Sequence, residues 1–315
     1  AFLRAVETGS RVIFVGDVDQ LPSVGAGNVL KDMIRSERLK VVRLQHVFRQ
    51  AQESAIIMNA HRINQGDEPV LNEEGTDFFF MRRAYADDVA TTIRELVTKR
   101  LPKFTGCDGL SDMQILTPMR KGTLGVQNLN AVLQETLNPA AFDKREVHFR
   151  QIVFREGDKV MQIKNNYNVV WKCYDCKSGK RYDEGLGVYN GDAGIILSID
   201  NDAEQMRVAF DDGKIVDYDF ANLEELELAY AITIHKSQGS EYPVVILPVY
   251  SGPPMLMTRN LLYTAVTRAK QLVVLVGLRE TVSAMIHNDR EVGRYTGLAQ
   301  RIQNLHDFMH GGDIL

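Results

Sequence analysis

The chain has 315 residues, of which 44% are hydrophobic and 25% charged, and its formal net charge at pH 7 is −4. A chain of this length and composition buries a large core, which excludes disordered, collagen-like and disulfide-scaffold proteins and leaves room for about two domains. No stretch approaches the roughly 18 apolar residues of a membrane span, and we expect no signal peptide. Three cysteines suit a reducing compartment, which predicts a cytoplasmic protein.

The first 44 residues contain few predicted elements. Residues 11–15 are apolar and β-branched and are followed by Gly16-Asp17, which predicts a buried parallel strand that ends in a site loop. A helix is predicted over residues 28–36. These elements are too few for a closed sheet, so residues 1–44 are interpreted as the C-terminal remnant of a first α/β domain.

Residues 45–145 have an α/β pattern. Helices are predicted at 54–64, at 87–100 with Asp87 as N-cap, and at 125–137; strands are predicted at 77–81 and 113–116. After residue 226 the same pattern returns, with apolar strands at 244–249 and 272–277 and a helix at 259–269. Residues 45–145 and 226–315 are therefore predicted to form a second α/β domain.

Residues 146–225 differ from both flanks. Short alternating runs occur at 159–163, 193–199 and 206–210, and Asn190-Gly191 and Asp212-Gly213 are dipeptides typical of hairpin turns. This pattern predicts a small antiparallel β-barrel inserted into the second domain.

Several loops carry residues suited to phosphate chemistry. Gln20, after the first predicted strand, can hydrogen-bond a phosphate oxygen and an attacking water at once. Arg49 and Arg268 have planar forks that suit phosphoryl groups, although a surface ion pair for Arg49 and a helix C-terminal position for Arg268 remain alternatives. Arg120 lies in a basic loop after a strand, which is either a phosphate contact or a solvated turn.

Five segments, in this order, resemble superfamily 1 DNA helicases of the RecD-like branch, the relatives of the exodeoxyribonuclease V alpha subunit. They are GDVDQLPSVGAGNVL, LQHVFRQ, ILTPMRKGTLGVQNLN, ITIHKSQGSEYPVVILP and LLYTAVTRAK. The resemblance covers nearly the whole chain and corresponds to the C-terminal part of such a helicase. It implies a RecA-like, P-loop NTPase-type parallel sheet with an inserted small Src-homology-type antiparallel β-barrel.

The resemblance also implies an activity. ATP and Mg²⁺ would lie between two RecA-like domains, and single-stranded DNA would cross their top and be followed from 5′ to 3′. Gln20, Arg49 and Arg268 are the implied catalytic residues, and Gly239 and Glu241 are the implied nucleotide contacts. The implied DNA-binding residues are Pro22, Ser23, Val24, Pro118, Arg120, Thr233, His235 and Ser237.

One part of the helicase pattern is missing. No G-x-x-x-x-G-K-[ST] motif occurs in the sequence, and the chain starts after the position of the family's Mg²⁺-binding Asp-Glu pair. We therefore interpret the chain as a fragment and expect it not to hydrolyse ATP by itself.

Some interpretations stay open. A non-catalytic module that binds single-stranded nucleic acid or protein, and an RNA helicase of the same superfamily, are the alternatives. Single-stranded DNA is the expected partner, together with recombination or repair proteins, and no membrane is expected. The pair Cys173-x-x-Cys176 is interpreted as incidental thiols of a hairpin, with a metal or redox role as the alternative and no metal ligand assigned.

Overall fold

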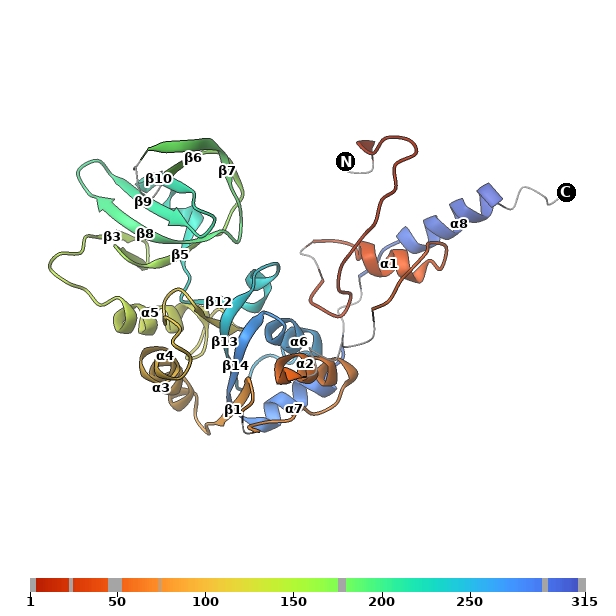
Figure 1. The fold of residues 1–315 in the computed structure, drawn as a ribbon, viewed down its shortest axis with the longest axis horizontal. Coiled ribbons are helices and arrows are strands. Elements are labelled where there is room, and N and C mark those ends of the chain that lie inside the picture. Colours follow the sequence, from red (N-terminus) through yellow and green to blue (C-terminus); the bar gives the residue numbers. More distant parts are fainter. Residues whose placement is uncertain are drawn as a thin grey trace.

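The computed structural model describes residues 4–22, 25–44, 53–73, 75–174, 180–290 and 294–310. Within these residues it has a five-stranded parallel sheet, a seven-stranded antiparallel sheet and a two-stranded hairpin. Figure 1 shows the parallel sheet between layers of helices, with the antiparallel sheet above one end of it. None of the helices in the described ranges is long and apolar enough to cross a bilayer.

The parallel sheet has the order β1-β14-β13-β2-β12. Its strands are β1 (Phe78–Arg82), β2 (Met113–Thr117), β12 (Ala231–Thr233), β13 (Tyr242–Val249) and β14 (Ala269–Gly277). Alternate side chains of each strand point to opposite faces, so Ile246 packs into one core and Val245 into the other. Helices cover both faces, which explains why these strands are apolar at nearly every position.

The helices fall into two groups around this sheet. One group packs against the face that includes Ile246 and consists of α3 (Ala86–Glu95), the π-helical turn η3 (Leu96–Arg100), α4 (Leu101–Thr105) and α5 (Val126–Leu137). The other packs against the face that includes Val245 and consists of α2 (Ala55–Gln65), α6 (Arg259–Val266) and α7 (Arg279–His287).

The antiparallel sheet curls into a barrel and has the order β11-β5-β8-β9-β10-β6-β7. The strands are β5 (Lys159–Gln162), β6 (Asn166–Tyr174), β7 (Arg181–Val188), β8 (Ala193–Asp200), β9 (Gln205–Phe210), β10 (Ile215–Asp219) and β11 (Leu226–Leu228), with the 3-10 turn η4 (Phe220–Glu225) before β11. The hairpin of β3 (Glu146–Phe149) and β4 (Ile152–Arg155) precedes them.

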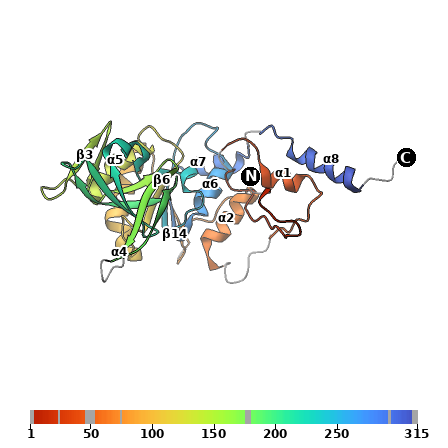
Figure 2. The same ribbon diagram turned by 90° about the horizontal axis from the view of Figure 1, so that it is seen from above.

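The first and the last described α-helices pack together, away from the barrel. Helix α8 (Leu298–His310) contacts α1 (Val29–Arg35), and Figure 2 shows this pair at the opposite end of the molecule from the barrel. The buried carboxylate of Asp32 accepts a hydrogen bond from Thr296 Oγ1 at 2.8 Å. Arg38 and Asp307 form an ion pair at 3.1 Å.

The structure corrects the prediction for residues 11–15, which form no strand. Ile13 and Val15 have 76% and 90% of their surface exposed. A strand needs a neighbour to take its backbone hydrogen bonds, and no described strand lies beside this segment. An apolar β-branched run is therefore not sufficient for a strand here.

Two smaller predictions are also corrected. The helix expected from Asp87 to Arg100 begins after the N-cap Tyr85 and changes to a π-turn at Leu96, because Pro102 has no N–H to continue the regular hydrogen-bond ladder. Asn190-Gly191 joins β7 to β8, which are not neighbours in the sheet, so it is no hairpin turn. Asp212-Gly213 does join the paired strands β9 and β10, as predicted.

Candidate functional site

Arg268 is a buried cation whose partners are neutral. It lies between α6 and β14 with 7% of its surface exposed. Its Nη2 donates to Gln20 Oε1 at 3.2 Å, its Nη1 to the Ser240 carbonyl at 3.1 Å and its Nε to the Thr264 carbonyl at 3.2 Å. A guanidinium stays protonated at any physiological pH, so a positive charge is held here that its described acceptors do not neutralise.

The loop that carries Gln20 is held in place by residues close to Arg268. The Leu21 N–H donates to Thr264 Oγ1 at 2.8 Å, and Gln238 Nε2 donates to the Leu21 carbonyl at 2.6 Å. Tyr263 donates its hydroxyl hydrogen to Asp17 Oδ2 at 2.9 Å. The N–H and carbonyl groups of Leu21 and the carboxylate of Asp17 are thus hydrogen-bonded to side chains more than 200 positions away in the sequence.

A cavity opens beside this contact, between α2 and α6. Its volume is about 260 Å³, which is slightly less than a typical small-ligand pocket. It is lined by Ile56, Ile57, Ala60, His61, Asn64, Tyr263, Thr267 and Ala269. Burial and the neighbouring Asp17 carboxylate raise the pKa of the Tyr263 hydroxyl, so it remains a proton donor at neutral pH. The cavity therefore has polar groups on the side that faces the Gln20 loop.

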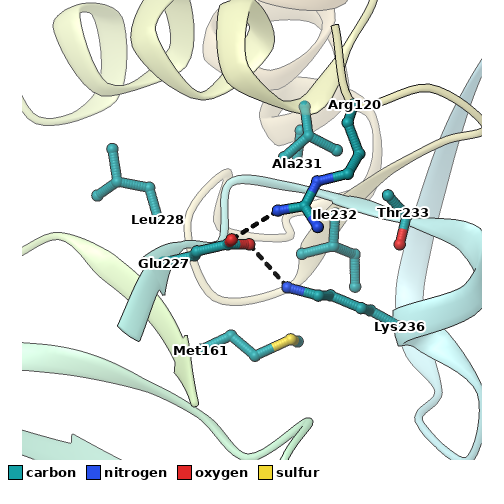
Figure 3. Close-up of a pocket in the computed structure, with 9 residues that line it drawn as sticks. Arg120, Met161, Glu227, Leu228, Ala231, Ile232, Thr233 and Lys236 are labelled. Carbon is teal, nitrogen blue, oxygen red and sulfur yellow. Dashed lines mark hydrogen bonds and ion pairs between the residues drawn. The ribbon is translucent and has the colours of Figure 1, made fainter. Parts of the chain in front are cut away.

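A second group of charged residues lies where the barrel meets the parallel sheet. Figure 3 shows the Glu227 carboxylate of β11 between Arg120 and Lys236. The carboxylate oxygens lie 2.7 Å from Arg120 Nη2 and 2.7 Å from Lys236 Nζ. Thr233 is at the same pocket, at the carboxyl end of β12. Arg120 follows β2 and Lys236 is in the 3-10 turn η5 (Ile234–Ser237), so both cations also come from the carboxyl ends of strands.

The two groups lie at opposite ends of the parallel sheet. Ser240 and Arg268 lie just before the amino ends of β13 and β14, whereas Thr233 ends β12 and Arg120 lies shortly after the carboxyl end of β2. Only the group around Arg120 therefore lies at carboxyl ends of strands.

Two of the predicted DNA-binding side chains do not reach the surface. Pro118 is buried, and Ser237 is fully buried with its hydroxyl donating to the Ile234 carbonyl at 2.8 Å. A hydroxyl that is enclosed and already bonded cannot contact a phosphate without opening of the turn. Both assignments stay predictions, and they would require this part of the chain to open.

The remaining described residues that were predicted to contact DNA or the nucleotide are accessible. Loss of hydration in its turn lowers the pKa of His235, so its imidazole is mainly neutral at pH 7 and can offer a hydrogen bond but little charge. Gly239 has a φ of +86° and is exposed. Glu241 is paired with Lys270 at 3.1 Å, and Pro22 is exposed.

Other predicted residues lie outside the described ranges. They are Ser23, Val24, Arg49 and Cys176. Their assignments stay predictions, as does the role of the pair Cys173-x-x-Cys176, of which Cys173 is buried in β6.

Sequence reasoning missed Glu227, Lys236 and Thr264 as members of these groups. Glu227 belongs to an acidic run, Glu224-Glu225-Leu226-Glu227, that resembles a solvated turn. Only the pairing of β11 with β5 places its carboxylate beside two cations from another sheet. Lys236 and Thr264 lie within the recognised motifs, so the motifs were the available signal for them.

Three protein-family models match separate parts of the chain. The SH3 domain of ATP-dependent RecD-like DNA helicases matches residues 129–210, the UvrD-like helicase C-terminal domain matches 228–276, and an AAA domain matches 1–78. The first match and the antiparallel sheet together confirm the predicted Src-homology-type barrel, and the parallel sheet with helices on both faces is the predicted RecA-like fold.

Curated relatives match over nearly the whole chain. The ATP-dependent RecD2 DNA helicase of Deinococcus radiodurans is 34% identical over 305 residues, which are 96% of this chain and 37% of that protein. The RecBCD enzyme subunit RecD of Mycolicibacterium smegmatis is 29% identical over 314 residues, covering 96% of this chain and 51% of the relative. The chain thus spans between about a third and a half of these relatives.

A solved structure of similar arrangement is the Pif1 helicase from Bacteroides in complex with ADP-AlF3 and ssDNA. It is 18% identical, has a TM-score of 0.46, and is matched over 94% of this chain and 66% of the other. We assign the family from the sequence matches instead. The family models match successive parts of the chain, namely the first segment, the barrel and the final strands, and the RecD2 relative matches nearly all of it. The chain belongs to the RecD-like helicases.

Proposed function

We propose that this chain is part of an ATP-dependent DNA helicase that moves 5′ to 3′ along single-stranded DNA. In this proposal residues 1–44 end a first RecA-like domain, residues 45–145 and 226–315 form the second, and residues 146–225 form the inserted barrel. ATP and Mg²⁺ would bind between the two RecA-like domains. Family membership and the names of the relatives support the activity.

The observation that carries the proposal is the contact between Gln20 and Arg268. These residues are 248 positions apart, yet their side chains share a hydrogen bond. A terminal phosphate at this point would take donors from the guanidinium and release the Gln20 carboxamide to orient a water molecule. Arg268 has no acidic partner among the described residues, so its full charge is available when negative charge develops.

The chemistry of these residues fits a nucleotide's phosphates but supplies only part of a site. Arg268 and Gln20 present a cation and an amide; the proposal assigns Gly239 and Glu241 to the rest of the nucleotide and adds Arg49 as a second cation. It assigns no Mg²⁺ ligand to this chain. ATP supplies the free energy, and this chain's residues would hold the phosphate end and close the two domains on it.

Strand binding is assigned to the other end of the sheet. Arg120, Thr233 and His235 are at or near its surface and offer donors to backbone phosphates, with Pro22, Ser23 and Val24 adding contacts from the first domain. Such contacts fix position without reading sequence. Because RecD relatives are named as subunits of the RecBCD enzyme, we include recombination or repair proteins among the partners and place the protein in the cytoplasm.

The test is Arg268→Ala in the full-length parent, assayed by phosphate release with single-stranded DNA present. We expect turnover to fall by about 10³-fold or more, the range measured for arginine fingers, with strand affinity kept. Arg268→Lys keeps the charge but not the fork and should remain strongly impaired.

Arg120→Ala is the matched control and should weaken strand binding first. Normal turnover with lost strand binding in Arg268→Ala would reverse the assignment, and tighter binding of RNA than DNA would change the substrate.

A further inference from the structure

The pocket of Arg120, Lys236 and Glu227 has a feature that strand binding alone does not require. Two cations that follow strands of the parallel sheet are bridged by one carboxylate from β11, an edge strand of the antiparallel sheet (Figure 3). The side chain of Arg120 is 60% exposed, whereas those of Glu227 and Lys236 are 23% and 21% exposed. The carboxylate therefore sits in the inner part of the pocket, with the guanidinium at its rim.

The free space in the pocket is too small for a second anion. Its volume is about 10 Å³, roughly the space of one water molecule. A phosphate group is several times larger, so it reaches Lys236 only if the Glu227 carboxylate leaves. The Thr233 hydroxyl lines the same pocket and makes no hydrogen bond among the described residues, which leaves it available to an incoming oxygen.

The backbone of Glu227 is fixed while its side chain can turn. Glu227 is in register with Met161 across the β11–β5 pair, so its Cα cannot follow a departing carboxylate. Rotation about the side-chain bonds is sufficient to break both ion pairs, and partly exposed pairs of this kind are weakly held.

We propose that Glu227 is an internal substitute for a backbone phosphate of the single strand, and that the strand displaces it from Arg120 and Lys236 when it binds. The inference rests on the proposed strand binding and adds a residue that limits its affinity. Glu227 is a positioning residue in this role, because it holds the two cations in place while the strand is absent and opposes the strand by its like charge.

The charge count gives the expected size of the effect. With Glu227 the three side chains carry a net charge of +1, and with glutamine they carry +2. Each additional cation that meets a single-strand phosphate steepens the plot of log K against log salt by about 0.7, which is about fivefold in affinity at ~0.1 M salt.

The experiment compares this chain with its Glu227→Gln variant. Binding of a labelled oligothymidine of about 16 nucleotides is followed by fluorescence anisotropy between about 50 and 200 mM salt. We expect the variant to bind about fivefold more tightly, with a slope steeper by about 0.7. Thermal melting of both proteins checks that the change does not come from unfolding.

Glu224→Gln is the matched control. Glu224 also bridges two cations, Arg150 at 3.0 Å and Lys164 at 2.6 Å, and the substitution removes the same charge three residues away. Those two cations are exposed and belong to the barrel region, so the control should change affinity less than about twofold. In an Arg120→Ala background, Glu227→Gln should lose much of its gain.

The outcomes separate the two proposals. If the wild-type chain binds the strand and Glu227→Gln matches it or matches Glu224→Gln, the role of Glu227 is overturned and strand binding stands. If no variant binds the strand at low salt, the proposed strand binding fails and this inference fails with it. Inorganic phosphate as competitor gives a further arm, since stronger competition against Glu227→Gln than against wild type supports direct anion binding in the pocket.

Discussion

Two buried arginines in this molecule have opposite surroundings. Arg155, at the end of β4, is 4% exposed and is paired with Glu146 across the β3–β4 hairpin and with Glu135 of α5 at 3.2 Å. Arg268 is 7% exposed and donates only to neutral oxygens among the described residues. The charge of Arg155 is thus neutralised by two carboxylates, whereas the charge of Arg268, beside the Gln20 loop, has no described counter-ion.

The difference separates an arginine that joins elements of the fold from one that the proposed function assigns to a ligand. Arg155 also donates to the Asn138 carbonyl at the end of α5, so two of its three acceptors join the hairpin to α5. Next to it, buried Asp158 accepts from Asn138, Gln134 and Tyr230 at 2.6–2.7 Å. Arg268 has no comparable network within the described part of the chain, and burying a charge without a counter-ion opposes folding. In the proposed function an anion joins it.

The largest effect expected from this comparison is the loss of stability in Arg155→Ala. Its removal leaves Glu146 and the Asn138 carbonyl without their donor in a poorly hydrated place. We expect the free energy of unfolding to fall by about 3 kcal/mol, measured by urea denaturation at pH 7. Arg155→Lys should fall between the alanine variant and wild type, because one ammonium cannot reach three acceptors in the arginine's geometry.

Arg268→Ala is the matched variant for that measurement. It removes an uncompensated charge together with its hydrogen bonds, and these two changes act in opposite directions. Its free energy of unfolding should therefore lie within about 1 kcal/mol of wild type. Equal losses in the two variants would remove the distinction between a structural and a ligand-directed arginine.

The sequence predicts one of these regions far better than the other. Gln20 and Arg268 lie in two of the short segments that resemble the helicase family, so a local pattern is enough to single them out. Arg155, Asp158 and Glu227 lie in no motif; their partners are set by how the barrel packs on α5 and β12, which no local pattern contains. Apolar alternation predicts β8 and β9 well, but it fails at residues 11–15, because a strand depends on neighbours that a local pattern cannot show.

A third buried cation sharpens the comparison. Lys159 of β5 is 5% exposed, has only a 3.4 Å contact with the Met113 carbonyl, and lies near Asp211 and Asp112 without a described ion pair. Burial lowers the pKa of Lys159 to about 8. Below pH 8 the folded protein thus holds a charge it disfavours, whereas the unfolded chain keeps its lysine protonated up to about pH 10.4.

We therefore expect Lys159→Met to raise the free energy of unfolding at pH 7 by about 2 kcal/mol. Between pH 8 and 10.4 the unfolded wild-type chain binds the additional proton, so wild-type stability gains with rising pH relative to the variant. The gap between the two proteins should shrink over that range in urea denaturation. A gap that is constant with pH would show that the lysine's charge is not the cause, and a destabilised variant would place Lys159 with Arg155 as a required structural cation.

The smallest effect concerns the link that brings the Gln20 loop to Arg268. Thr264 is fully buried; its Oγ1 accepts from the Leu21 N–H and donates to the Asn260 carbonyl at 2.7 Å. Thr264→Val keeps the shape and removes both bonds, so we expect a loss of about 1 kcal/mol in the free energy of unfolding. Hydrogen exchange at the Leu21 amide should rise by about fivefold, because its acceptor is gone. Thr264→Ser retains the oxygen and should keep that protection.

In the full-length parent the valine variant should turn over ATP more slowly with unchanged strand affinity, because Gln20 is no longer held against Arg268. Full activity with a freed Leu21 amide would show that the loop needs no such anchor, and that the contact between Gln20 and Arg268 forms without it.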